Sequence, residues 1–350
     1  MAFEKLADKL AKKSFNSPDF QKNWEVHVQA FGPILEPAFA EDYQSRIHLT
    51  AALNLLGKRS AAEGLKKLQL LQNKCKNDSD KAALLFFMGL AFEIAGQQEQ
   101  MLECYTYSNE YAHRFYLPYL KVAKFYLNGC LYEKAAENFS RAIACFDATG
   151  LDAQSRVILG SAYTNYATCL LMMHRYGEAE SAITTSKSLC PDAPGRIAVE
   201  MPLYAIRGDR EQVQRCLEAL KEHSPDAYDA MRESADRILS HADPHFFPAE
   251  VDEGKVNAFW TWFSGQAEEL YTLLEQQKYE EAVNRVADRL LLTFPFLEEP
   301  PYIALGKEEE GYVLELHDLY AAAVMNAFEI LQHNCPGPEV LGRIRFVVVH

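Results

Sequence analysis

This chain lacks the charge pattern of proteins that bind nucleic acids or anionic membranes. Its 350 residues include 35 Lys and Arg against 49 Asp and Glu, which gives a net charge of −14, and basic residues never run beyond adjacent pairs. Because nucleic acids and anionic lipids are polyanions, they repel a protein with this balance. We therefore expect no nucleic-acid partner and no membrane partner, whereas a basic protein would be attracted.

Long apolar runs and disulfide frameworks are also missing. No apolar stretch approaches the roughly 20 residues that a membrane-spanning helix needs, and the N-terminus has the spacing of an amphipathic helix rather than a signal peptide. The eight cysteines include no Cys-x-x-Cys pair, and several lie beside Leu, Ile or Phe, which is typical of buried thiols. These features predict a cytoplasmic protein with reduced cysteines.

Signatures of catalysis and cofactor binding are absent as well. The sequence holds no glycine-rich phosphate loop, no His-Glu-x-x-His motif and no Gly-x-Ser-x-Gly motif. His241, Asp243 and His245 carry side chains that can bind metal, but Pro244 limits the curl that would bring them together. We predict no cofactor, no metal site and no enzymatic activity.

What the sequence does contain is a helix-pair pattern that returns after 34 residues. One copy places Ala167 on a first helix, Ala179 on a second helix and Pro191 after it. Val213 and Pro225 follow Ala179 and Pro191 by 34 residues each. A period of this length with small residues at fixed offsets is typical of a helical repeat array, in which stacked helix pairs bury a common core and form an extended concave surface.

Turn signals and composition divide the chain into four segments. Residues 1–40 are predicted to form N-terminal capping helices, and residues 41–240 a helical repeat array. Residues 241–254 contain two prolines and are predicted to be a linker, which leaves residues 255–350 as a C-terminal domain. The fold class predicted for the whole chain is mainly α.

The C-terminal domain is predicted to be a small α+β module. Three helices and three strands are expected, at 256–274, 279–294, 302–305, 312–317, 320–333 and 344–349. The second strand follows from a period of two, and the last from a run of β-branched residues. Because the chain ends inside that apolar run, either the last strand is buried in a sheet or the domain continues past His350.

The repeat pattern resembles that of the tetratricopeptide repeat (TPR) family over roughly residues 43–230. The family's bulky, small and aromatic positions fall on Leu85, Met88, Gly89, Phe92, Met101, Tyr105 and Ser108 in one copy, and on Tyr119, Val122, Ala123, Tyr126, Ala135, Phe139 and Ala142 in the next. The resemblance implies a TPR-like α–α superhelix. The start of the C-terminal domain, Phe259-Trp-Thr-Trp-Phe263, looks like an accessory domain of bacterial proteins.

The resemblance also implies that a partner binds in the concave groove, against fixed positions of each first helix. On this chain those positions include Phe86, Leu90, Glu93, Leu117, Leu120, Lys124, Asn128, Thr164, Thr168 and Leu171. Only Lys124 and Asn128 resemble the residues with which some family members clamp a carboxylate, so a clamp is disfavoured. The mainly apolar wall would suit a helix face or an extended apolar peptide. Alternatively, a flanking segment of the same chain fills the groove.

Three functional hypotheses remain at this stage. The prediction is a non-enzymatic scaffold or adaptor that binds a protein segment or peptide in the groove. The second is a peptide-sensing regulatory protein whose output is another protein contact. The third is an enzyme with its site in the C-terminal module near His317, where Asp318 could complete half of an acid–base pair, although no third group is identifiable.

Overall fold

The computed structural model describes residues 31–349, apart from 112–114, 147–149, 192–193, 224, 298, 309–310 and 338–340. The chain divides into two compact units. The first comprises Met1–Leu170 and Gly177–Arg196, and the second comprises Leu171–Tyr176 and Ile197–His350. The capping helices expected before residue 31 lie outside the described residues. None of the described helices is long and apolar enough to cross a membrane.

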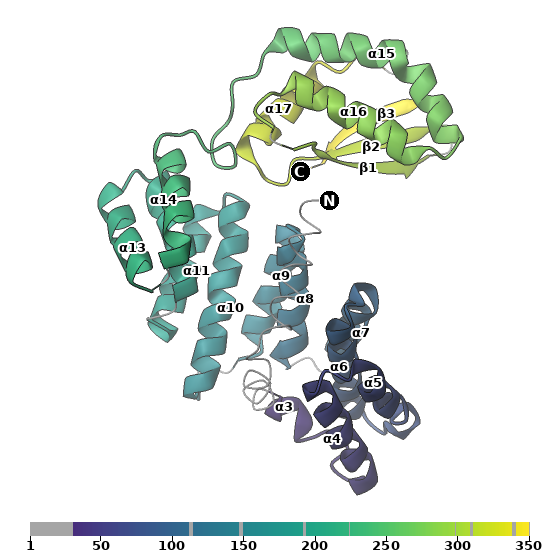
Figure 1. Cartoon of the computed structure of the whole chain (residues 1–350), viewed down its shortest axis with the longest axis vertical. Helices are drawn as coiled ribbons and strands as arrows, with labels where there is room; N and C mark the ends of the chain where they lie inside the picture. The colour runs from purple at the N-terminus through teal and green to yellow at the C-terminus, as the bar shows by residue number, and fades with distance from the viewer. Residues whose placement is uncertain are drawn as a thin grey trace. The chain divides into compact units, whose positions relative to one another are not determined.

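The first unit consists of helix pairs. Its elements are α3 (Gly32–Leu35), α4 (Tyr43–Gly57), α5 (Ala61–Gln69), η1 (Gln72–Lys74), α6 (Asp78–Ala95), α7 (Gln98–Tyr111), α8 (Tyr116–Asn128), α9 (Tyr132–Ala144), most of α10 (Ala153–Met172) and α11 (Tyr176–Leu189), and η2 (Pro194–Arg196). Helices α4 and α5, α6 and α7, and α8 and α9 pack as hairpins, and α5–α6 and α7–α8 contacts join successive pairs (Figure 1).

Local sequence signals explain where α6 begins and ends. The Asn77 side chain accepts a hydrogen bond from the Asp80 N–H and caps the first turn. Gly96 follows the last turn with φ of 74°, a left-handed conformation that glycine adopts without steric cost. Gly96 therefore ends α6.

The repeat register is visible in how the paired helices touch. A Cβ added at Gly89 of α6 would lie 2.8 Å from the Tyr105 ring of α7, so only glycine permits this approach. The Ser108 hydroxyl donates to the Ala82 carbonyl (2.9 Å), and the Ser186 hydroxyl donates to the Gly160 carbonyl (2.8 Å). Both bonds span 26 residues, so two copies of the repeat make the same contact at the same offset.

The second unit begins with α12 (Ile197–Ile206), α13 (Arg210–His223) and α14 (Pro225–Leu239), which pack against one another. The C-terminal module follows, with α15 (Glu253–Glu275), α16 (Tyr279–Thr293), β1 (Tyr302–Lys307), β2 (Tyr312–His317), α17 (Ala322–His333) and β3 (Ile344–Val349). The expected α+β module is confirmed in its three strands and in the order of its elements. Helix α14 ends at Leu239, just before the segment predicted to be the linker.

The sheet has the order β1-β2-β3, with β1 antiparallel and β3 parallel to β2. Helices α15, α16 and α17 cover one face of it (Figure 1). The strand residues that enter this core are Ile303, Tyr312, Leu314, Leu316, Ile344 and Phe346. Trp260 of α15 is buried in the same core, and its indole N–H donates to the Leu331 carbonyl of α17 (2.9 Å).

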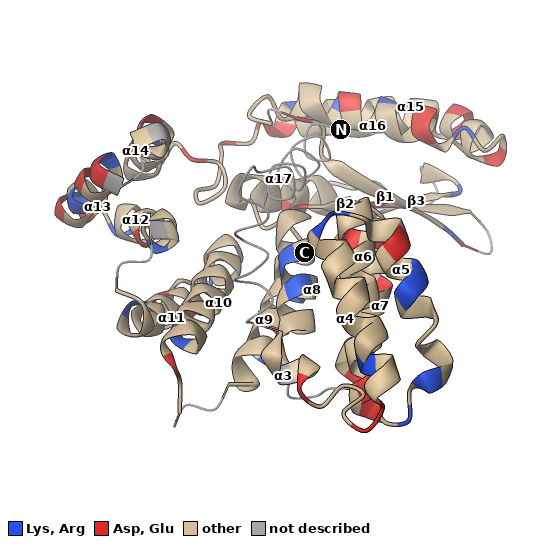
Figure 2. Ribbon diagram, turned by 60° about the horizontal axis from the view of Figure 1, so that its bottom comes forward, with Lys and Arg blue, Asp and Glu red and all other residues tan. Residues whose placement is uncertain are grey.

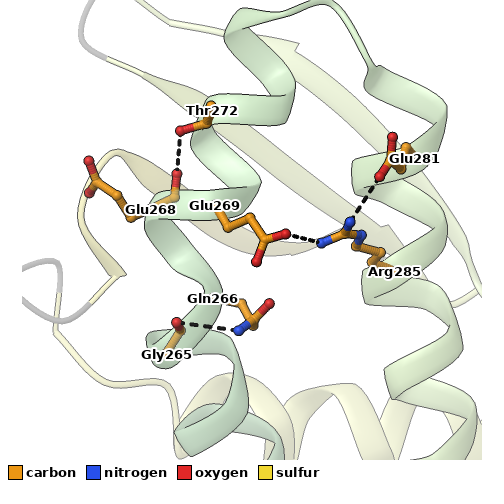
Figure 3. Close-up of polar contacts among 7 residues, drawn as sticks. All are labelled: Gly265, Gln266, Glu268, Glu269, Thr272, Glu281 and Arg285. Atoms are coloured by element: carbon orange, nitrogen blue, oxygen red, sulfur yellow. Dashed lines mark hydrogen bonds and ion pairs between the residues drawn. The ribbon is translucent and has the colours of Figure 1, made fainter.

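A charged bridge joins the two long helices of the module. The Arg285 guanidinium on α16 donates to Glu269 on α15 (2.7 Å) and to Glu281 one turn earlier (2.9 Å), as Figure 3 shows. These carboxylates, Glu269 first, raise the pKa of Arg285. Because all three side chains are solvent-exposed, the bridge orients the helices more than it stabilises them.

Replacing a small residue between paired helices with a large one should destabilise the repeat. Ala135 on α9 is fully buried at one of the family's small positions. We expect Ala135→Leu to lower the free energy of unfolding by about 1–3 kcal/mol, because the added methyl groups have no space. Urea denaturation followed by circular dichroism measures the change.

The control is Ala62→Leu, the same substitution at an exposed position of α5. It should change the free energy of unfolding by no more than about 0.5 kcal/mol. Equal losses in the two variants would contradict the proposed packing of α9.

Candidate functional site

The predicted groove residues lie at three depths in the structure. Phe86, Leu90, Leu120, Thr164 and Leu171 are buried, Glu93, Leu117 and Thr168 are half-buried, and Lys124 and Asn128 are exposed. Leu171 belongs to the second unit, whereas the other residues belong to the first. The surface that a partner could touch is therefore carried by the half-buried and exposed residues.

Phe86 is buried because the chain itself covers it. Its ring makes edge contacts with Phe31, which precedes α3, and with Phe115, which precedes α8, at centroid distances of 5.5 and 5.2 Å. Phe31 also packs on Phe87. The alternative that a flanking segment fills the groove thus describes this part of α6. An aromatic ring with no polar atom is stable only under such cover.

The two threonines use their hydroxyl groups inside the protein. The Thr164 hydroxyl lies 3.1 Å from the Gly160 carbonyl and 2.8 Å from the Ser186 hydroxyl of α11. The Thr168 hydroxyl donates to the Thr164 carbonyl (3.1 Å). Thr164 is therefore part of the contact between α10 and α11, and Thr168 alone of the two remains half-exposed.

A partly buried charge cluster lies where α6, α7 and α8 meet. The Glu93 carboxylate accepts a hydrogen bond from the buried Tyr105 hydroxyl (2.6 Å) and from Lys121 Nζ (2.8 Å). The Glu93 and Lys121 side chains are 19% and 20% exposed, so solvent screens this pair less than a surface pair. Sequence reasoning assigned Glu93 but missed Lys121, because no local spacing rule pairs residues that lie 28 apart.

Lys124 lies one turn further along α8 and is exposed. Desolvation by neighbouring protein atoms, followed by the positive charge of Lys121, lowers the pKa of Lys124, whereas Glu93 opposes the shift. The side chain nevertheless reaches the surface. No carboxylate within the described part of the chain makes an ion pair with Lys124.

The linker histidines take separate partners. The His241 ring stacks on Phe247 (4.3 Å between centroids), and His245 Nε2 lies 3.2 Å from the Met172 carbonyl. Asp243 instead accepts the His245 backbone N–H (3.0 Å). Among the residues that the structure describes, no group of three or more His, Cys, Asp or Glu side chains could hold a metal ion.

His245 also stacks on His174, with ring centroids 5.5 Å apart. His174 Nε2 faces the Tyr320 carbonyl, and its Nδ1 lies 2.6 Å from the Tyr176 hydroxyl. Because a carbonyl oxygen can only accept a hydrogen bond, the Nε2 atoms of His174 and His245 are the donors in these two contacts and each carries a hydrogen. Burial, and then the neighbouring His174, lower the pKa of His245 from 6.5 to about 4.

The pair considered for acid–base chemistry does not face a site. The His317 side chain is 28% exposed, lies 3.9 Å from Glu315 and packs against the Tyr302 ring. The buried Asp318 carboxylate accepts the Tyr320 backbone N–H (2.9 Å) and holds the turn after β2. Asp318 therefore has a structural role in this turn.

These features define the class of the protein as a mainly α, TPR-like helical repeat array with a small C-terminal α+β module. No family model matches the chain, and no curated protein matches it. The chain is similar to the solved structure of a MamA RS-1 double mutant, with 16% identity over 55% of this chain and 97% of that one and a TM-score of 0.41. It is also similar to the C-terminal part of a TPR repeat-containing protein from Cytophaga hutchinsonii, with 14% identity over 84% and 96% and a TM-score of 0.35. Because both TM-scores are low, the assignment to this class rests on the observed helix pairs and not on these two similarities.

Removing the Glu93 side chain should lower the free energy of unfolding more than removing that of an exposed glutamate. We expect Glu93→Ala to lower the free energy of unfolding by about 1–3 kcal/mol, because the buried Tyr105 hydroxyl loses its acceptor. The matched control is Glu137→Ala, which breaks the pair with Arg141, where both side chains are more than half exposed. The control should lose no more than about 1 kcal/mol, and equal losses in urea denaturation would contradict the account.

The folded protein should resist protonation of His245, and stability should fall as the pH falls. The unfolded chain binds this proton near pH 6.5, whereas the folded chain binds it only near pH 4, so the unfolded state gains stability between these values. Compared with His245→Gln, which keeps an N–H donor, the wild type should lose roughly 1–3 kcal/mol more between about pH 7.5 and about pH 4.5. Parallel unfolding free energies of the two proteins across this range would contradict the prediction.

Proposed function

We propose that this protein is a non-enzymatic scaffold that binds a segment of a partner protein on the helix A face. We define the helix A face as the accessible first-helix residues of the first unit, which are Glu93, Ile94, Leu117, Lys124, Leu127, Asn128 and Thr168. The observation that carries the proposal is Lys124, an exposed cation on α8 with no ion pair within the described residues.

The surroundings of Lys124 suit recognition of a peptide. Leu127 and Asn128 follow Lys124 by three and four residues, and Leu117 precedes it by seven, so all four lie on one side of α8. Lys121 and Lys124 are the two basic residues of α8, and Figure 2 shows blue segments on this helix. Half-buried leucines beside a cation favour a partner segment with apolar side chains and a nearby carboxylate.

Glu93 prepares this face for binding. It pairs with Lys121, whereas Lys124 makes no ion pair within the described residues. A partner carboxylate near Lys124 would also relieve the repulsion between the two lysines. The helix A face thus offers one specific charge contact within a mainly apolar surface.

Substitutions on the helix A face should abolish partner capture. Wild-type protein and the Lys124→Glu, Leu127→Asp double variant are each used to capture proteins from a lysate of the source organism. We expect at least one protein to be retained by the wild type and lost by the variant. With a peptide from that protein, the dissociation constant should rise by roughly tenfold or more for each substitution, and binding of the wild type should weaken with added salt.

The matched control is Lys66→Glu, which reverses an exposed lysine on α5 away from this face. All variants are first checked for wild-type circular dichroism. The proposal is wrong if the wild type and the folded double variant capture the same proteins, or if neither captures any.

A further inference from the structure

Strand β1 lies at an outer edge of the sheet in the C-terminal module (Figure 1). An edge strand has one row of backbone N–H and C=O groups that no neighbouring strand satisfies. The other edge belongs to β3, which contacts α17. The two edges differ in how these backbone groups are satisfied.

The hydrogen bonds of β2 show which groups of β1 point outward. The Tyr312 N–H donates to the Arg343 carbonyl (2.9 Å), so the backbone groups of Tyr312 face β3. Because these groups alternate along a strand, those of Leu314 and Leu316 also face β3, and those of Val313, Glu315 and His317 face β1. The register pairs those residues with Tyr302, Ala304 and Gly306. The backbone groups of Ile303, Leu305 and Lys307 consequently point to the free edge.

The edge of β3 is partly closed, whereas the edge of β1 is not. On β3, the outward Val348 N–H donates to the Gln332 side chain of α17 (2.8 Å). Within the described residues, the outward amides of Ile303, Leu305 and Lys307 meet no such acceptor. The centre of β1 is uncharged, since Lys307 is the only charged residue of this six-residue strand.

We propose that β1 pairs with β1 of a second copy of this chain, antiparallel and around a two-fold axis at Leu305. In this register Leu305 lies opposite Leu305 of the second copy, and Ile303 lies opposite its Lys307. All outward backbone groups of the three residues are then satisfied in both copies. The two sheets become one continuous sheet, with an interface that is the same on both sides.

Among registers with the two-fold axis at an outward-pointing residue of β1, the one centred on Leu305 avoids unfavourable pairs. A shift that centres the axis on Lys307 places two lysines opposite each other, which is destabilising. A shift toward Ile303 places outward groups against Pro301, which has no N–H to donate. In the proposed register, Ala304 lies opposite the second copy's Gly306, and Tyr302 lies opposite its Glu308. No like charges face each other, and this argues for a second copy over an unrelated strand.

The state of association of the full chain tests the proposal. Sedimentation velocity from about 1 µM to about 100 µM should show a monomer that becomes a dimer as concentration rises. Over the same range, the amides of Ile303, Leu305 and Lys307 should exchange hydrogen more slowly at high concentration, whereas those of Ala304 and Gly306 should be slow throughout. This alternation is specific to pairing along β1.

A proline variant adds an independent test. Leu305→Pro removes an outward N–H and leaves the bonds to β2 in place, so it should abolish the dimer. The matched control Leu305→Val keeps the N–H and should still dimerise. A wild type that stays monomeric, or a dimer with no alternating protection in β1, overturns the proposal. If Leu305→Pro does not fold, the exchange pattern of the wild type decides.

Discussion

The close approach of paired helices is the constraint on which the first unit depends. Gly89 lies directly under the Tyr105 ring, and the hydroxyl of Ser108 reaches the Ala82 carbonyl of the facing helix. Ser186 repeats that bond at Gly160. Such contacts require a small residue on one helix and a short polar or aromatic side chain on the other. They therefore set the distance between the two helices of each pair.

That packing also positions the charges of the helix A face. Tyr105 is buried because α6 and α7 approach closely, and its hydroxyl then needs an acceptor, which Glu93 supplies. Glu93 in turn holds Lys121 and leaves Lys124 as the cation on the surface. Under the proposed function, this buried hydroxyl between two repeat helices would determine which charge a partner meets.

The C-terminal module differs from the repeats, because one edge of its sheet has no pairing partner among the described residues. The crossover through α17 places β3 parallel to β2 and brings Gln332 over the outer edge of β3. Within the described residues, β1 has no equivalent acceptor for its outward amides, although α16 contacts this strand. The described part of the module therefore leaves backbone groups of β1 without a partner.

The sequence by itself determined the features that depend on neighbours along the chain. The helix-pair register and the three strands follow from spacing and β-branched residues, and the structure confirms them. Only the tertiary structure decided that Phe31 covers Phe86, that Glu93 binds Lys121, and that, within the described residues, a side chain bonds to the outer edge of β3 but not to that of β1. These contacts join residues far apart in sequence, and their existence depends on the packing of whole helices, which local periodicity does not encode.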